Sequence, residues 1–279
     1  MAARTTTLTL GPKLETNGNA LTVRDDATLN LRSMGTFDIE GGLTTIRGSL
    51  NFFDAAQLSA GTLNVVDDGL VNVTGSSLIS DATTISGGGT VFVNVNSNWT
   101  TSGAATIGES SSVVVNLNSE WEISGTLDVS GVLGVNGSEV TVSGAAELDS
   151  EMEGSKTLEI ENGGVVRFNG GGANNANSIV DVIDGTLDLA DKELTNAGTI
   201  TTGSAGEIVG DDEAGKFTVD GDLTQTADGK TVVNIGGTQE VDEFDKHSVF
   251  IIDDVDRDSE GGTLTLDGEL EVKLIDVGA

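Results

Sequence analysis

The 279-residue sequence contains no cysteine and no tyrosine, one proline and one histidine. Without cysteine the chain can form neither a disulfide scaffold nor the Cys-rich sites that hold structural zinc. Its one imidazole, His247, gives a Ser–His–Asp arrangement a single candidate base, and a Cys–His pair has no nucleophile. Asp245 and Lys246 place that histidine in a charged loop. We therefore predict no catalytic residue and no organic cofactor.

Basic residues are also scarce, with 13 Lys and Arg against 45 Asp and Glu and a net charge of −32. Such a field repels DNA, RNA and anionic lipid headgroups, which excludes nucleic acid as a partner. A solvated surface is the favoured interpretation of the acidity, and cation binding is the alternative. Asp doublets that could bind Ca²⁺ occur at 25–26, 67–68, 211–212 and 253–254, although the Gly-Gly-x-Gly-x-Asp repeat that would make such a site specific is absent.

Long hydrophobic runs are missing as well, so we predict no membrane insertion. The N-terminal ten residues, MAARTTTLTL, lack the apolar region of a signal peptide, and the chain ends at Ala279 without a membrane anchor. We expect either a removed signal or a route out of the cell that needs none, such as release of virus particles by lysis.

Internal repeats dominate what is present. Residues 91–103 (VFVNVNSNWTTSG) and 113–125 (VVVNLNSEWEISG) are near copies, with an offset of 22 between Trp99 and Trp121. Val71–Val73 precedes Val93–Val95 by the same offset, and Ser138–Gly144 follows Ser119–Gly125 by 19. A repeat near 20 residues is typical of a solenoid, and its drift indicates loops of variable length between fixed strands.

Within each repeat, apolar and polar residues alternate over short stretches that end in Gly-Gly, Asn-Gly or Ser-Gly, as strands and turns require. We predict an all-β, right-handed parallel β-helix in a single elongated stack, of about a dozen turns and on the order of 60 Å in length. An antiparallel sandwich is the competing all-β fold. Expected divisions are regular turns at 1–162, a Gly/Asn-rich loop at 163–178, and a continuing solenoid with a less regular acidic capping region at 179–279.

Side chains at equivalent repeat positions should stack from turn to turn. Trp99 and Trp121 could form a surface or corner platform for sugar rings, but packing in the core or at a corner is the favoured interpretation. Asn94 with Asn116, and Asn96 with Asn118, are expected to form amide ladders along the solenoid. Both roles would be structural.

The C-terminal fifth carries a family resemblance. Residues 221–237 (GDLTQTADGKTVVNIGG), Glu243–Asp245 and residues 262–274 (GTLTLDGELEVKL) resemble the closing segment of autotransporter-type passenger β-helices and related bacterial surface repeat proteins. The resemblance implies an extracellular parallel β-helix. Residues 250–261 are unusually acidic for this pattern.

These observations predict a non-enzymatic structural or adhesive protein that forms a rigid acidic β-solenoid on a virion, as a phage fibre, appendage or capsid decoration, or on a bacterial surface. The alternative is a glycan-binding or glycan-cleaving β-helix enzyme that uses carboxylate pairs. Expected partners are further copies of the chain, other structural proteins or a cell-surface glycan.

Overall fold

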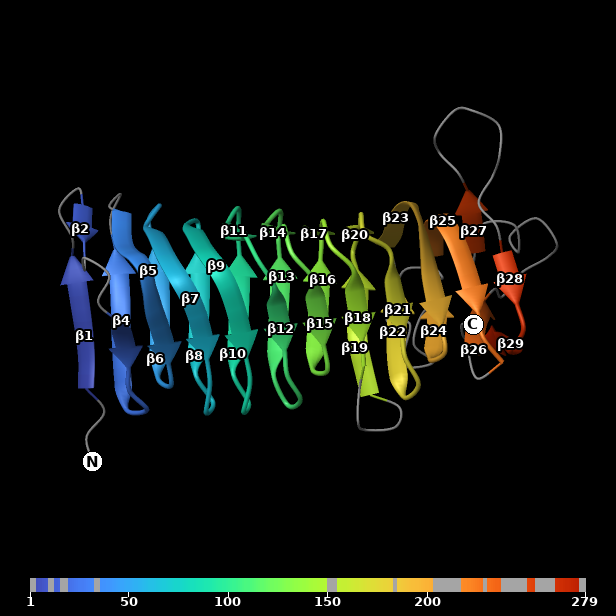
Figure 1. The fold of residues 1–279 in the computed structure, drawn as a ribbon, viewed down its shortest axis with the longest axis horizontal. Coiled ribbons are helices and arrows are strands. Elements are labelled where there is room, and N and C mark those ends of the chain that lie inside the picture. Colours follow the sequence, from blue (N-terminus) through green and yellow to red (C-terminus); the bar gives the residue numbers. More distant parts are fainter. Residues whose placement is uncertain are drawn as a thin grey trace.

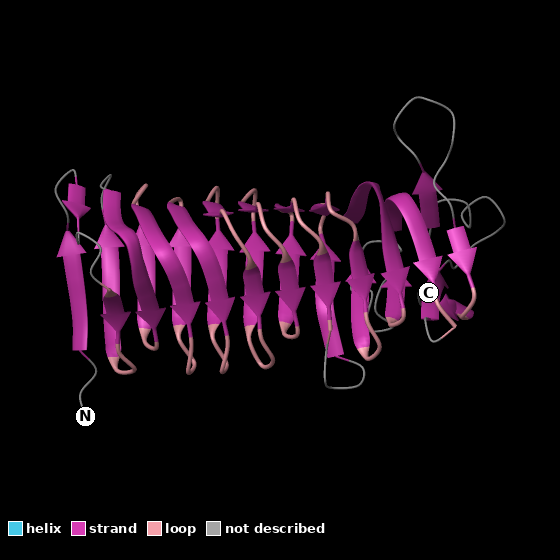
Figure 2. Cartoon of the chain, in the orientation of Figure 1, coloured by secondary structure: helices cyan, strands magenta, loops and turns pink. Residues whose placement is uncertain are grey.

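A computed structural model of the chain describes residues 4–9, 13–15, 20–32, 36–149, 155–182, 185–202, 217–227, 230–236, 250–253 and 264–275. Within these residues the regular structure is entirely β-strand (Figure 2). Successive turns of the chain follow one another along the long axis, from the blue N-terminal end to the red C-terminal end (Figure 1). His247 and the doublet at 211–212 lie outside the described residues.

One side of the stack is a twelve-stranded sheet, sheet A, whose order follows the chain and whose neighbours are all parallel. Its strands are β1 (Arg4–Thr9), β4 (Ala27–Arg32), β6 (Ser49–Phe53), β8 (Leu70–Thr74), β10 (Thr90–Asn94), β13 (Ser112–Asn116), β16 (Val132–Asn136), β19 (Ser155–Glu161), β22 (Ser178–Val182), β24 (Thr199–Thr202), β26 (Lys230–Gly236) and β29 (Glu269–Ile275). Each turn contributes one strand, so sheet A has the expected dozen turns.

The remaining strands form sheet B, also parallel, which bends into two faces. In some turns one long strand crosses the bend, and in others two short strands flank it. Its strands are β2 (Lys13–Glu15), β3 (Leu21–Val23), β5 (Thr36–Ile46), β7 (Gln57–Val65), β9 (Ser77–Ile85), β11 (Asn98–Thr101), β12 (Ala105–Ile107), β14 (Glu120–Ile123), β15 (Leu127–Val129), β17 (Glu139–Val142), β18 (Ala146–Leu148), β20 (Gly164–Phe168), β21 (Gly172–Asn174), β23 (Gly185–Asn196), β25 (Phe217–Gln225), β27 (Phe250–Asp253) and β28 (Leu264–Leu266). The predicted parallel β-helix is confirmed, and the antiparallel sandwich is excluded.

The register of strand pairing follows the sequence offset where the repeats are most alike. Trp99 pairs with Trp121 at the expected offset of 22, and Glu120 pairs with Glu139 at 19. The expected alignment of Val71 with Val93 is wrong, because Val71 pairs with Val91. A slip of two residues leaves every side chain on the same side of the sheet, so alternation alone does not detect it.

The core is one continuous column of aliphatic and aromatic side chains. Alternate residues of each regular strand point inward, as in β10, where Val91 and Val93 are fully buried and the residues between are half-buried. The connected buried cluster runs from Val23 to Ile200. Inward side chains of sheet A therefore face those of both halves of sheet B across a narrow interior.

Two kinds of corner hold the turns in line. At the bend of sheet B, Gly103, Gly125, Gly144 and Gly170 stack so closely that a Cβ on Gly125 would lie 2.4 Å from the carbonyl carbon of Gly103. Between sheet A and sheet B, a buried serine recurs: the backbone N–H of Ser97 donates to Ser119 Oγ at 3.2 Å, and Ser76 and Ser119 donate likewise one turn on. The predicted Ser-Gly punctuation thus marks corners where only small residues fit.

Residues 163–178 do not form the loop expected from their composition. They contain β20, β21 and the first residue of β22, each paired with its neighbours. Their glycines serve the corners, since a Cβ on Gly170 would lie 2.3 Å from the backbone of Gly144. Asn174 points inward, fully buried, and donates through Nδ2 to Asn196 Oδ1 at 2.8 Å. A buried amide thus explains Asn174, whereas Asn177 is exposed and has a positive φ of 75°.

Pairing continues through the C-terminal segments that carry the family resemblance, at wider spacing. Phe217 pairs with Phe250 and Lys230 with Glu269, offsets of 33 and 39 residues. Longer connections between paired strands are consistent with the less regular C-terminal β region expected from the sequence.

Adding a methyl group to Gly125 should destabilise the fold, because its Cβ would overlap the backbone of Gly103. We expect Gly125→Ala to cost about 1–3 kcal/mol of unfolding free energy, the usual range for overpacking. Gly134→Ala is the matched control, since its Cβ would meet only Val114 at 3.7 Å, and it should stabilise by up to about 1 kcal/mol. Urea denaturation would measure both, and equal effects would contradict the corner constraint.

Candidate interaction surface

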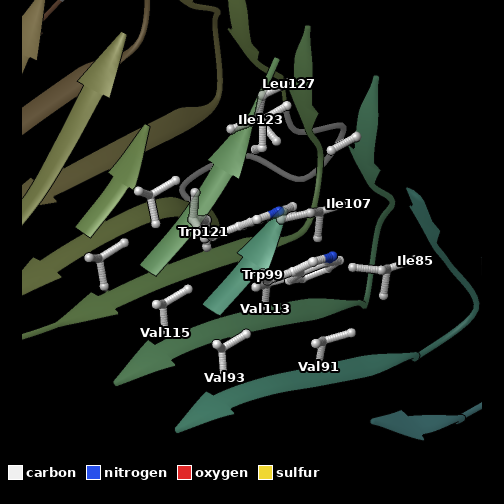
Figure 3. Packing of buried hydrophobic residues seen from close by; sticks show 14 of the residues in the cluster. Ile85, Val91, Val93, Trp99, Ile107, Val113, Val115, Trp121, Ile123 and Leu127 are labelled. Atoms are coloured by element: carbon white, nitrogen blue, oxygen red, sulfur yellow. The ribbon is translucent and has the colours of Figure 1, made fainter. Parts of the chain in front are cut away.

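Trp99 and Trp121 lie in the core and not at a surface or corner, so the platform for sugar rings is wrong. Both are fully buried, with ring centroids 4.2 Å apart and planes inclined by 7°. They extend from β11 and β14 toward the valines of β10 and β13, as Figure 3 shows. The stacked pair fills the interior of two successive turns and contributes packing.

Each indole N–H finds a hydroxyl acceptor one turn earlier. Trp99 Nε1 donates to Ser80 Oγ at 3.3 Å, and Trp121 Nε1 donates to Thr101 Oγ1 at 3.2 Å. Ser80 and Thr101 are directly opposite each other in the register and are fully buried, with Thr83 in contact with both. The small polar cluster satisfies the indoles inside an otherwise apolar core.

Asparagine ladders run along the outside of sheet A. Asn116 Nδ2 donates to Asn94 Oδ1 at 2.9 Å, in the position that the repeat predicted. A second ladder, which sequence reasoning missed, joins Asn30, Asn51 and Asn72 at 2.9 and 2.7 Å. Its signal was the spacing of 21 residues between asparagines at the centre of three strands.

Asn96 and Asn118 occupy a corner between the sheets. Both have positive φ, 55° and 57°, and are exposed. At this corner the two turns meet through the backbone, where the N–H of Asn96 donates to the carbonyl of Leu117 at 3.1 Å. Asparagine suits this left-handed backbone, which accounts for the residue type without an amide ladder.

Six adjacent strands of sheet A present an outward surface without acidic residues. Its strands β4, β6, β8, β10, β13 and β16 contain no Asp or Glu, and the last five contain no charged residue of any kind. We call the outward side chains of these six strands the acid-free face. Besides the asparagine ladders it carries half-buried or exposed apolar side chains, namely Phe53, Leu70, Phe92, Val114 and Val132. In a chain of net charge −32, this is a neutral, partly apolar surface.

Acidic residues gather on sheet B instead. Glu120 stands opposite Glu139 in the register, and Glu122 lies two residues along on the same strand. Partial burial, the charges of Glu122 and Glu139 and a hydrogen bond with Glu122 all raise the pKa of Glu120. On the second half of the sheet, burial and the charges of Glu147 and Asp149 raise the pKa of Asp128.

One arginine bridges this acidic ladder. Arg167, on β20, donates through Nη1 to Glu139 and through Nε to Asp188, so it links three successive turns. Sequence reasoning missed it, although a single base at an outward strand position in so acidic a region was the available signal. The bridge shows that the exterior of sheet B is organised by charge.

Metal binding by clustered side chains has no geometric support in the described part of the chain. There, no group of three or more His, Asp or Glu residues could hold a metal ion. Asp67, with positive φ, belongs to a turn and pairs with Arg47 at 3.2 Å. A groove of about 300 Å³ lies at the corner near Gly75 and Asn98, and Asn98 pairs in the register with Glu120 of the carboxylate cluster.

Comparison with known proteins does not assign the chain to a family. No protein-family model matches the chain, and neither a curated protein nor a solved structure matches it. Among the described residues, none forms a helix with the length and hydropathy of a membrane span.

Removing the acceptor of Trp121 should leave its indole N–H without a partner in the core. We expect Thr101→Val, nearly isosteric, to lower the unfolding free energy by about 1–3 kcal/mol. Thr100→Val changes the outward neighbour on the same strand and should stay within about 0.5 kcal/mol of the wild type. Urea unfolding followed by tryptophan fluorescence distinguishes the two, and an equal loss in both would argue against the buried hydrogen bond.

The pKa of Glu120 is raised in the folded state. The stability that Glu120 contributes is therefore fully present at pH values below 4.5, the pKa of this carboxyl in the unfolded chain. The contribution is lost as pH rises through the folded pKa. Glu122→Gln removes a like charge, so at pH 7 we expect a gain of about 0.3 kcal/mol, screened by salt, and a lower Glu120 pKa in an NMR titration. Asp81→Asn removes one acidic charge elsewhere on sheet B, and it should leave the Glu120 titration unchanged.

Proposed function

We propose that the protein is a non-enzymatic structural element, a stiff acidic rod displayed outside the cell on a virus particle or a bacterial surface. Its work is to span distance and hold attached parts at a fixed separation. The observation that carries this proposal is the uninterrupted core from Val23 to Ile200, together with backbone pairing between successive strands of sheet A. Within the described residues of this span, each strand of sheet A pairs with the strand before it and the strand after it.

Stiffness follows from how the turns are joined. Bending the rod would open hydrogen bonds between strands on one side and separate the stacked side chains beneath them. Each pair of turns is held by sheet A, by both halves of sheet B and by backbone bonds through the corners, such as Ser124 N–H to the Thr101 carbonyl at 2.9 Å. A repeat protein built this way resists bending without disulfides.

The extracellular setting is supported by the resemblance of residues 221–237 and 262–274 to passenger β-helices, and the cysteine-free composition is compatible with it. High negative charge keeps extended proteins apart from one another and from anionic polymers. Virion and bacterial surface both suit such a rod.

A glycan-cleaving function is a second candidate, favoured by one observation. Glu120, with its raised pKa, stands beside Glu122 in the manner of an acid and base pair. The two lie on an outward strand face, and the groove near Gly75 reaches Asn98, the register partner of Glu120. If wild-type protein released reducing ends from a polysaccharide and Glu120→Gln did not, the enzymatic candidate would replace the structural one.

Electron microscopy of the purified protein should show straight rods of one length. Twelve turns at about 4.8 Å predict a body roughly 55 Å long, lengthened by side chains and terminal segments. Antibodies against the protein should label the outside of intact cells or of purified virus particles. Labelling confined to the cell interior, or particles that bend freely, would contradict the proposed role.

A further inference from the structure

The acid-free face has a symmetrical layout about its centre. Strand β10 lies in the middle of the five uncharged strands, with β6 and β8 on one side and β13 and β16 on the other. Beyond β6 comes β4, which ends at the exposed base Arg32, and beyond β16 comes β19, which ends at the half-buried acid Glu161. Opposite charges thus flank a neutral centre at equal distances.

We propose that a second copy of this chain packs on the acid-free face, sheet A against sheet A, with the two rods antiparallel and a twofold axis along β10. Two copies of net charge −32 repel each other most where sheet B would meet sheet B, because its carboxylates lie there. The acid-free face lets two copies approach without bringing carboxylates into contact. This interface is independent of the proposed structural role.

The twofold axis fixes which strands meet. It sets β10 against β10 and Phe92 against Phe92, and it exchanges β8 with the partner's β13 and β6 with its β16. At the two ends, β4 of one copy faces β19 of the other. Arg32 and Glu161 are each the last residue of their strand, so this arrangement sets a base opposite an acid twice. Parallel rods would instead set β4 against β4 and β19 against β19, so Arg32 would not face Glu161.

The area of the acid-free face limits how strongly two copies can associate. Six strands at about 4.8 Å and five residues at about 3.3 Å give roughly 24 by 16 Å, or about 400 Å² per copy in projection. Stable interfaces bury about 800 Å² per partner, so this pair is a weak one. It gains from exposed apolar side chains at its margin, including Leu117 at 58% and Val95 at 44% exposure.

Sedimentation velocity at increasing concentrations tests the pairing. We expect a monomer–dimer equilibrium that strengthens at least tenfold from 20 mM to 500 mM NaCl, because salt screens the repulsion between the rods. Val114→Asp, an added charge within the face, should weaken association at least tenfold. Thr84→Asp adds the same charge on sheet B, where its strand neighbours are Asn64 and Thr106, and should not.

Cross-linking tests the arrangement directly, since the wild-type chain has no cysteine. Thr90→Cys lies on β10, next to the axis, and should form a covalent dimer with a short bismaleimide, whereas Thr84→Cys should not. Arg32→Glu should weaken association, and the double variant Arg32→Glu/Glu161→Arg should restore it. Circular dichroism of each variant would verify folding.

A protein that stays monomeric at every concentration and salt level would overturn the proposal. Binding of a neutral glycan to the acid-free face of such a monomer would not rescue it, because the proposed occupant is a second copy of the chain. Association that survives Val114→Asp, or cross-linking as efficient at position 84 as at position 90, would overturn it as well. Because rods, surface display and dimers are measured separately, loss of the dimer would leave the structural role standing.

Discussion

Between the two ends of the stack, the described strands find partners for their backbone N–H and C=O groups in the turn before and the turn after. That requirement fixes the corners, because consecutive turns can pair on all faces only if each bends at the same place. Gly103, Gly125 and Gly144 meet it by the absence of a side chain, and Ser97 and Ser119 by hydroxyls that accept backbone N–H groups. Stacked indoles and asparagine ladders are consequences of turns held in register.

How much the sequence predicts depends on how alike adjacent turns are. Where the copies are nearly identical, equal chain length between corners implies equal register, and the pairings of Trp99 with Trp121 and Asn94 with Asn116 could be predicted from spacing. Further upstream the turn is two residues shorter, and Val71 pairs with Val91. Because side chains alternate with a period of two, such a slip leaves no trace in the hydrophobic pattern.

Inward polar residues were beyond prediction for a different reason. Asn174 lies in the segment whose composition predicted a loop, yet it is fully buried and bonded to Asn196, which is also fully buried. An amide is stable inside a solenoid when the next turn supplies another amide at the same position, because each then satisfies its neighbour. That condition depends on register between residues 22 apart in the chain, which no local window contains.

Outward positions on a solenoid have no such constraint. The fold does not forbid acids on sheet A, since β19 carries Glu159 and Glu161 directly beside Gly134 and Asn136 of β16. Nor does it demand apolar residues there, because Phe92 and Val114 could be polar without affecting the core that Val91 and Val93 fill. Segregating nearly all the acid away from six adjacent strands is therefore a property of the exterior alone. Exterior chemistry that folding does not require is best explained by contact with something outside the chain.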